Sequence, residues 1–438
     1  MGALAPNPFI FYKEERIIKL VSISLRRFFN LSLLQQKILF TALILIILVI
    51  GKTLPLPLVD FQTLSDHYQA DDFLSVALSV TGGDLERASL FTLGIGPYMS
   101  TMIIWRFVAM SKWYKKLKVP IKKETIYRNL LTLVIGSIQA LSLVMAYPLN
   151  QEIALADGLM QAILVIFLLA GSFYLIWLGN KNTEFGIGGP TVIILANMLM
   201  RIPRNFSAMQ TYITGIANQE EIYLFAFSAL FAAFTALTTI LMEKGERRIP
   251  LNRVMINNDF AEKSYLPIKA NPSGGMAIMY AMTITALPRY ILQLILHFNP
   301  EASWAEALMA NLGMTQPLGA GIYLAIVIFL SLGFAFVNVD PEELAENLQK
   351  SGDYISGVNP GKATEGYLRR VIFYMACIGT GYMLFVVGLP TVLGVIFPEH
   401  ARTLRSASSI LILFSLSLGI LEELKALHIR GKYKGIFE

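Results

Sequence analysis

The chain has 438 residues, of which 55% are hydrophobic and 15% charged, with a formal net charge of +6 and a mean hydropathy of +0.57. Because soluble domains usually carry about a quarter charged residues, this composition excludes an ordinary soluble protein and indicates a polytopic membrane protein. Cys377 is the single cysteine and the four histidines are scattered along the chain, so we expect neither a disulfide nor a metal site.

Ten apolar segments of the sequence are candidates for membrane-spanning helices. In chain order they are residues 36–56, 90–110, 129–148, 159–178, 187–201, 222–242, 274–296, 317–338, 370–395 and 406–423. No connection between them is long enough for a separate soluble domain. We therefore predict an all-α protein with one membrane domain.

Four of the ten segments contain helix-weakening residues, and these four form two pairs offset by five. The second segment contains Gly94-Ile95-Gly96-Pro97, the fifth opens with Gly186-Ile187-Gly188-Gly189-Pro190, the seventh follows Asn271-Pro272-Ser273-Gly274-Gly275, and the tenth is serine-rich from Ser406 to Ser417. Interrupted helices survive in a membrane only beside protein or water. The pattern predicts two five-helix halves, residues 1–203 and 204–438, in which these helices line a transport pathway.

Lys and Arg gather at alternate ends of the expected helices. They cluster before the first segment, after the second, sixth and eighth, and at the end of the chain, whereas residues 151–158 and 298–316 contain none. Basic loops face the cytoplasm, so both termini are expected inside. With an odd number of spans in each half, the second half enters the membrane from the opposite side, which makes an inverted repeat.

The polar content of the segments argues against several kinds of transport. We expect no Asp or Glu in the membrane interior, which disfavours an ion-driven pump. Arg106 and Arg289 lie toward the cytoplasmic and outer ends of their segments, and snorkelling to the interface is favoured over a functional role. No nucleotide-binding motif is present, so any ATP-driven work must come from a partner.

Two cytoplasmic loops and one outer segment stand out by length and composition. The loops, residues 243–273 and 338–370, are long for helix connections, which favours a partner-binding platform over ordinary basic loops. The segment from Asp71 to Gly83 is small, mostly apolar, too short to span, and ends at a double glycine. A helix folded back as a removable stopper and a merely interfacial helix both remain open.

Several motifs resemble those of the SecY family, the protein-conducting channels of the general secretion pathway, in family order across essentially the whole chain. They are Leu93-Gly94-Ile95-Gly96-Pro97-Tyr98-Met99, Thr183-Glu184-Phe185-Gly186-Ile187-Gly188, Glu246-Arg247-Arg248-Ile249-Pro250, Leu266-Pro267-Ile268-Lys269-Ala270-Asn271 and Phe334-Ala335-Phe336-Val337-Asn338-Val339-Asp340-Pro341-Glu342. Together they are highly specific, although each alone is weak.

The resemblance implies ten transmembrane helices around a central pore, with a plug helix at about residues 71–83 and a lateral gate between the second and seventh helices. It assigns an apolar pore ring to Ile95, Met99, Thr191, Leu195, Met279 and Ile412, and plug residues to Phe73, Leu74, Ala77, Leu78, Val80, Gly82 and Gly83. It assigns the lateral gate to Pro97, Tyr98, Tyr280 and Thr283, and motor contacts to Arg247, Arg248, Lys269, Asn359 and Lys362. Without the resemblance, ordinary helix packing would explain the ring residues better.

The chain departs from the family pattern at three places. Asn359 replaces the arginine of the usual Gly-Ile-Arg-Pro-Gly sequence, Pro190 replaces a glycine, and Thr191 brings a hydroxyl to the ring. Motor engagement should therefore differ in detail, and the closed pore should leak more than one with isoleucine at position 191. The chain resembles an accessory SecY of Gram-positive bacteria, which exports glycosylated, serine-rich adhesins.

We therefore expect a plasma-membrane channel subunit for unfolded preproteins, without enzymatic activity or cofactor. Expected partners are a SecA-type ATPase, a SecE-like protein and other small subunits, preprotein and membrane lipid, but no nucleic acid. An inverted-repeat secondary transporter of a small solute is the alternative, but it needs polar substrate groups at mid-membrane. A structural or lipid-scrambling protein is a further alternative, and it would need no motor platform.

Overall fold

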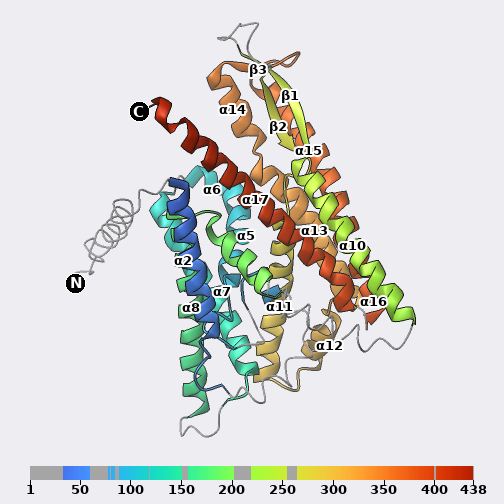
Figure 1. Ribbon diagram of the computed structural model, residues 1–438. Helices are drawn as coiled ribbons and strands as arrows, with labels where there is room; N and C mark the ends of the chain where they lie inside the picture. Colours follow the sequence, from blue (N-terminus) through green and yellow to red (C-terminus); the bar gives the residue numbers. More distant parts are fainter. Residues whose placement is uncertain are drawn as a thin grey trace, which may run out of the picture.

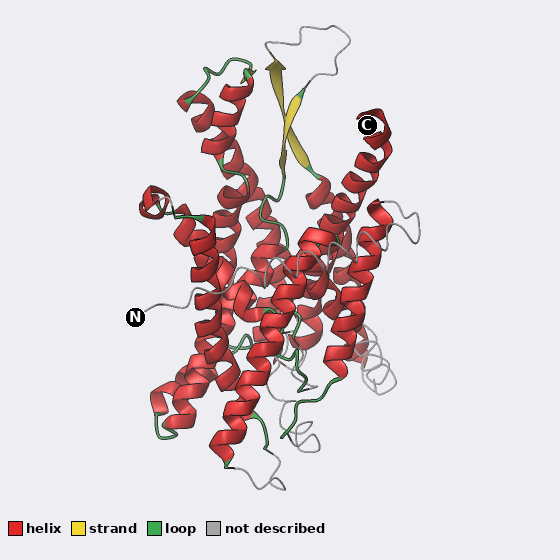
Figure 2. Cartoon of the chain, turned by 90° about the vertical axis from the view of Figure 1, so that its left-hand side faces the viewer, coloured by secondary structure: helices red, strands yellow, loops and turns green. Residues whose placement is uncertain are grey.

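Long helices make up most of the molecule, and a small sheet projects from one end of it (Figure 1, Figure 2). This computed structural model describes residues 33–59, 77–78, 80–83, 88–117, 119–149, 156–201, 219–253, 264–398 and 401–437. Each of the ten apolar segments overlaps helical residues in this described part of the chain.

The helices before residue 219 are α2 (Leu33–Thr53), α5 (Gly96–Met110), α6 (Lys112–Leu117), α7 (Ile121–Ala146), α8 (Asp157–Phe185) and a helix over Gly189–Arg201. Those that follow are α10 (Gln219–Lys244), α11 (Met276–Phe298), α12 (Ser303–Asn311), α13 (Pro317–Asn338), α14 (Pro341–Ser351), α15 (Lys362–Met383), α16 (Leu389–Ile396) and α17 (Ala401–Phe437).

Seven helices in the described part of the chain are long and apolar enough to cross a membrane. Large apolar side chains such as Ile46, Leu130 and Leu237 remain exposed on their outer faces. Exposed apolar surface on this scale is unfavourable in water and matches a hydrocarbon surrounding. The molecule is therefore a multi-pass membrane protein.

The interruption that we expected in the tenth segment is absent, because α17 is continuous from Ala401 to Phe437. A serine hydroxyl can bond back to its own helix, as the Ser417 hydroxyl does to the Leu413 carbonyl at 2.7 Å, so serines do not break a helix. The ninth segment is irregular instead. It contains a π-helical turn over Leu384–Gly388, and Pro390, which lacks a backbone N–H, follows this turn.

The two long loops, which the sequence did not predict to contain strands, join in one three-stranded sheet. Its order is β2 (Tyr265–Lys269), β1 (Glu246–Arg253) and β3 (Asp353–Ile355), and both contacts are antiparallel. A separate apolar cluster that includes Ile249, Ile268 and Leu348 lies between the sheet, α14 and α15. This cluster fixes the sheet to the membrane helices.

The main apolar core runs through nearly all the long helices. It takes buried side chains from α2, α5, α7, α8, the helix Gly189–Arg201, α11, α13 and α17. Two groups of helices meet there, since α5 and α7 contact α11, and α2 contacts α17.

Candidate functional site

Five of the six predicted ring residues belong to the main core or pack against it, and the sixth, Thr191, is half-buried. Ile95, Met99, Met279 and Ile412 are at most 4% exposed, and Leu195 packs against the same cluster. The backbones of α11 and α17 approach closely here, because a Cβ built on Gly275 would lie 3.4 Å from the Cα of Ile412. The ring side chains thus face other protein groups and not the outer surface.

The start of α5 rests directly on the backbone of the segment before it. The Ile95 N–H donates to the Thr81 carbonyl at 2.9 Å. Gly94 has a φ of +58°, and a Cβ built on it would lie 2.4 Å from the Gly83 nitrogen and 2.6 Å from the Thr81 oxygen. Only glycine can adopt this positive φ and also fit against the neighbouring backbone atoms.

The described residues of the predicted plug are buried and contact the start of α5. They are Ala77, Leu78, Val80, Gly82 and Gly83, while Phe73 and Leu74 lie outside the described residues. The Gly83 N–H donates to the Leu78 carbonyl at 2.8 Å, which closes a short turn. The segment therefore lies between the start of α5 and the helix Gly189–Arg201, whose Ile193 side chain is 3.5 Å from a Cβ built on Gly82.

The start of α11 is held by hydrogen bonds to side chains, whereas the start of α5 is held by backbone groups. The Gly275 N–H donates to the Ser415 hydroxyl at 2.8 Å, and that hydroxyl donates to the Glu243 carboxylate at 2.5 Å. This chain of bonds joins α11 to α17 and α10. Glu243 is only 9% exposed, so a buried carboxylate lies one residue beyond the sixth expected span. The expectation that the spans contain no carboxylate is wrong at the tenth segment, which ends with Glu422 and Glu423.

A second chain of hydroxyl groups joins the same helix start to α13 and α15. The Ser273 and Ser331 hydroxyls lie 3.1 Å apart, and the Thr380 hydroxyl donates to Ser331 at 2.9 Å. All three residues are buried. The start of α11 is consequently bound to four neighbouring helices through hydrogen bonds that satisfy buried polar groups.

The helix Gly189–Arg201 also begins with side-chain contacts. The Gly188 N–H donates to the Glu423 carboxylate of α17 at 2.9 Å. The Thr191 hydroxyl donates to the Gly188 carbonyl, so its polarity is engaged within its own helix turn. The expectation that this hydroxyl stands in the ring as a polar group is weakened accordingly.

Contacts between α5 or α7 and α11 or α13 form the seam at the predicted lateral gate. Of the predicted gate residues, Pro97, Tyr280 and Thr283 are buried and Tyr98 is half-buried, yet the Tyr280 ring packs on Phe334 of its own helix group, with ring centroids 5.1 Å apart. In the described contacts, none of these four residues supplies a polar bond across the seam.

The residues that form hydrogen bonds across the seam were not predicted from the sequence. The Ser142 hydroxyl of α7 donates to the Gln293 side-chain oxygen of α11 at 2.7 Å. At the sheet end, the Arg106 guanidinium donates to the Asn338 side-chain oxygen at 3.2 Å, and the Phe107 ring stacks on Phe329 with centroids 5.3 Å apart. Only Arg106 carried a sequence signal, as a cation within an apolar segment.

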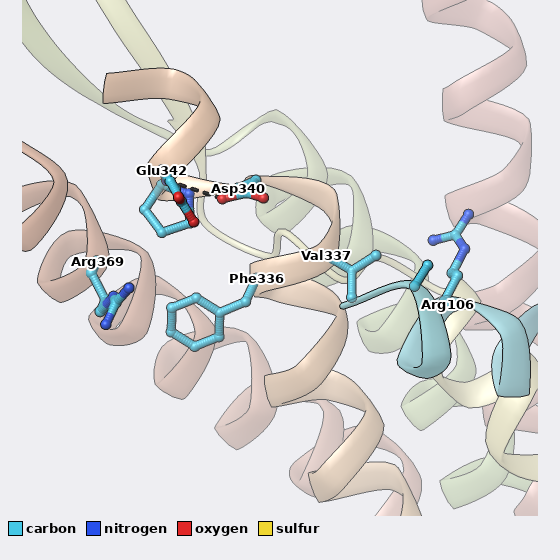
Figure 3. Close-up of a pocket in the computed structure, with 8 residues that line it drawn as sticks. Arg106, Phe336, Val337, Asp340, Glu342 and Arg369 are labelled. Atoms are coloured by element: carbon cyan, nitrogen blue, oxygen red, sulfur yellow. Dashed lines mark hydrogen bonds between the residues drawn. The ribbon is translucent and has the colours of Figure 1, made fainter. Parts of the chain in front are cut away.

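A cavity of about 380 Å³ opens at the sheet end of this seam. Arg106 of α5 and Arg369 of α15 lie on either side of it, with Phe336 of α13 between them (Figure 3). Asp340 caps α14 by accepting a hydrogen bond from the Glu342 N–H at 3.0 Å. None of the predicted site residues lines this cavity.

The predicted motor-contact residues occupy the projecting sheet and the start of α15. Arg247, Arg248 and Lys269 lie on β1 and β2, and Asn359 and Lys362 lie just after β3. The hydrogen bond that the Arg248 guanidinium donates to the Glu246 carboxylate raises the pKa of Arg248. The same guanidinium lies 4.7 Å from the centre of the Tyr265 ring. The basic residues on the sheet therefore come from one loop, and β3 joins the second loop to that loop.

Two buried cations, Arg289 and Lys52, differ from what the sequence indicated. Arg289 is 7% exposed, so its guanidinium is buried and does not snorkel to the surface. Lys52, near the end of α2, is 6% exposed and was overlooked although it lies in the first apolar segment. Within the described residues, no three His, Cys, Asp or Glu side chains gather as a metal site would require.

Comparison with known proteins agrees with this arrangement. The SecY family model matches residues 89–421. An accessory Sec system protein translocase subunit SecY2 from Leuconostoc gelidum subsp. gasicomitatum is 36% identical over 413 residues, covering 93% of this chain and 98% of that protein. The protein of the same name from Streptococcus sanguinis is 35% identical over 403 residues, covering 92% and 97%.

Solved structures show the same fold at lower identity. A structure described as a protein-conducting channel matches with a TM-score of 0.63 at 18% identity, covering 90% of this chain and 93% of that one. Sec61 in a canine ribosome-channel complex matches with a TM-score of 0.59 at 16% identity, covering 90% and 93%. By its family match and the extent of its likeness to these relatives, the chain belongs to the SecY family.

Proposed function

We propose that this chain is the protein-conducting channel subunit of an accessory Sec translocase. It moves unfolded secretory protein across the bacterial plasma membrane, driven by a separate SecA-type ATPase. The observation that supports this proposal best is the gathering of apolar ring residues from α5, the helix Gly189–Arg201, α11 and α17 in one buried cluster. The names of the relatives support the accessory assignment.

Solvent physics explains why such a channel needs an apolar ring. An extended chain in hydrocarbon would leave backbone groups unpaired at a cost of several kcal/mol each, so the channel must offer a wet path. An apolar constriction excludes water when empty and fits loosely around any side chain when occupied. Met99 and Met279 have flexible side chains that widen the range of sizes the ring accepts.

The proposed resting state is closed by the segment of residues 71–83, which acts as the plug. Its described end is buried against the start of α5. Ten helices form two inverted halves, residues 1–203 and 204–438, which part along the seam of α5 and α7 with α11 and α13. Opening of this seam gives a signal sequence access to lipid.

The sheet of β1, β2 and β3 is the proposed cytoplasmic platform for the motor. Both termini lie on its side of the membrane, where positive loops accumulate. Lys269 of β2 forms an ion pair with Glu422 of α17 at 2.9 Å, and the next residue, Glu423, binds the start of the helix Gly189–Arg201. This contact path links the platform to a ring helix. A SecE-like protein and other small subunits complete the complex.

Reconstitution tests the function directly. Proteoliposomes that contain the full chain with its small subunits, a SecA-type ATPase and a preprotein should protect the preprotein from added protease only when ATP is present. Single cysteines at Ile95, Met279 and Ile412 in a Cys377→Ser background should each crosslink to a stalled preprotein that carries its own cysteine. A secondary transporter or a scaffold would give neither ATP-dependent protection nor these crosslinks.

A further inference from the structure

The end of α2 carries a buried positive charge that the proposed translocation path does not use. Lys52 is 6% exposed, one residue before α2 ends at Thr53. Removing an ammonium group from water is costly unless it is hydrogen-bonded, and cations buried within membrane helices usually have a functional role. Its contacts therefore indicate what it does.

Lys52 is bonded to the predicted plug through one intervening side chain. Its ammonium donates to the side-chain oxygen of Asn197, and the side-chain nitrogen of Asn197 donates to the Gly83 carbonyl at 3.0 Å. Asn197 is 1% exposed and lies two residues after Leu195 of the ring. The relay thus runs from α2, through the helix Gly189–Arg201, to the last residue of the segment that supports the start of α5.

We propose that Lys52 and Asn197 form a latch that holds the carboxyl-terminal end of the plug in the closed channel. When the plug leaves, Asn197 loses the Gly83 carbonyl, and water replaces the plug beside the Lys52 ammonium. The latch then becomes a fixed positive charge on the outer side of the ring. An open pore should therefore favour anions, because a single charge in a narrow path attracts ions of opposite sign.

This inference rests on the proposed function, since the segment is a plug only in a channel. A purely structural role of Lys52, in which it joins α2 to the helix Gly189–Arg201, predicts a different result. It would affect stability but would not change the ion selectivity of an open pore. Selectivity therefore separates the two roles.

Planar-bilayer recordings of the full channel in a KCl gradient test the latch. Asn197→Leu should raise the open fraction without preprotein about tenfold, the effect of losing a buried hydrogen bond of about 1.4 kcal/mol. Lys52→Met should raise it by less, because Asn197 keeps its bond to Gly83 and loses only the ammonium that orients it. Asn197→Leu should keep the anion preference because the ammonium remains. Lys52→Met should shift the reversal potential toward cation permeation.

Two further variants control for folding and for position. Lys52→Gln keeps a donor without the charge, so its leak should stay nearer the parent while its reversal potential shifts as in Lys52→Met. Lys37→Met is the matched control, because Lys37 also lies on α2 and donates to a backbone carbonyl, that of Gly186 at 3.1 Å, near the opposite end of the helix. It should change neither quantity.

Deletion of residues 71–80 separates failure of the latch from failure of the function. If that deletion produces no conductance, the chain is not a plugged channel, and both proposals fall. If it conducts while Lys52→Met and Asn197→Leu behave like the parent, only the latch is wrong. A raised leak in Lys52→Met with the parental reversal potential also overturns the latch, since the charge would then lie off the ion path.

Discussion

The starts of α5 and α11 are held by different groups, although both helices follow a glycine with a positive φ. Gly94 and Gly274 each lie two residues before the first helical residue, and each has a φ of +58°. Before α5, the backbone of residues 81–83 fills the space around the glycine. Before α11, the nearest neighbours are the side chains of Glu243 and Ser415, at 3.4 and 3.6 Å.

The difference indicates which helix start can move. The start of α11 is bonded to α10, α13, α15 and α17 through buried side chains, so it belongs to a rigid group. The start of α5 is bonded to the proposed plug through the Ile95 N–H. We therefore expect that departure of the proposed plug would free the start of α5 and leave α11 in place.

The largest expected effect comes from adding one methyl group at each of these glycines. Gly94→Ala should destabilise the seated plug by more than about 3 kcal/mol, because the new Cβ overlaps backbone atoms that cannot shift independently. Gly274→Ala carries the same cost of a positive φ, about 1 kcal/mol, without the overlap. The open fraction without preprotein in planar bilayers should thus rise about 100-fold in the first variant and less than tenfold in the second.

Equal ion leak in the two variants would contradict the proposed difference between the two glycines, because the strain of a positive φ alone would then explain both. Protein yield and elution from a sizing column should be compared at the same time. They show whether a leaky Gly94→Ala channel is still folded.

The next largest effect concerns the side-chain anchor of α11. Ser415→Ala removes the partner of both the Gly275 N–H and the Glu243 carboxylate, which should lower the free energy of unfolding by about 2 kcal/mol. Glu243→Gln keeps an acceptor oxygen and removes a buried charge, so its cost should stay below about 1 kcal/mol. Thermal unfolding in detergent measures both. A loss in Ser415→Ala no larger than that in Glu243→Gln would contradict the anchor.

A smaller effect is expected at the seam, where α7 meets α11. Ser142→Ala removes the bond to Gln293, and interhelical hydrogen bonds of this kind contribute about 0.6 kcal/mol in membranes. Export of a preprotein with a weakened signal sequence should therefore rise about threefold. Ser137→Ala is the matched control, because the Ser137 hydroxyl of the same helix bonds only to the Leu133 carbonyl at 2.8 Å in the described contacts. An equal rise in both variants would place the effect elsewhere than the seam.

The positions of the helices could be predicted from the sequence, but most of the contacts between them could not. Hydropathy finds an apolar helix because burial in lipid depends on composition alone, and the glycines before α5 and α11 mark close backbone approach. A hydrogen bond such as that of Ser142 with Gln293 joins residues 151 positions apart. Neither residue differs in type from many others, so nothing local in the sequence distinguishes the pair.

The two main errors have physical causes. The serine-rich tenth segment was expected to break, but serine hydroxyls bond to their own helix, as the Ser417 hydroxyl of α17 does. The loops after α10 and α13 were expected to lack strands, because their charged residues and turns hide the alternation that pairs β1 with β2 and β3. Strand pairing between separate loops depends on the tertiary fold, which a local pattern does not contain.

The smallest expected effect concerns Thr191 in the helix Gly189–Arg201, whose start is anchored by side chains as that of α11 is. Its hydroxyl already donates to the Gly188 carbonyl, so it offers little polarity to water in the ring. Thr191→Ile should therefore lower the resting leak less than threefold, by making the ring more apolar. Thr191→Val, which keeps the shape and removes the hydroxyl, should give nearly the same decrease. Equal or greater leak in Thr191→Ile, recorded in planar bilayers, would show that the hydroxyl matters more as an anchor of this helix start than as a polar group in the ring.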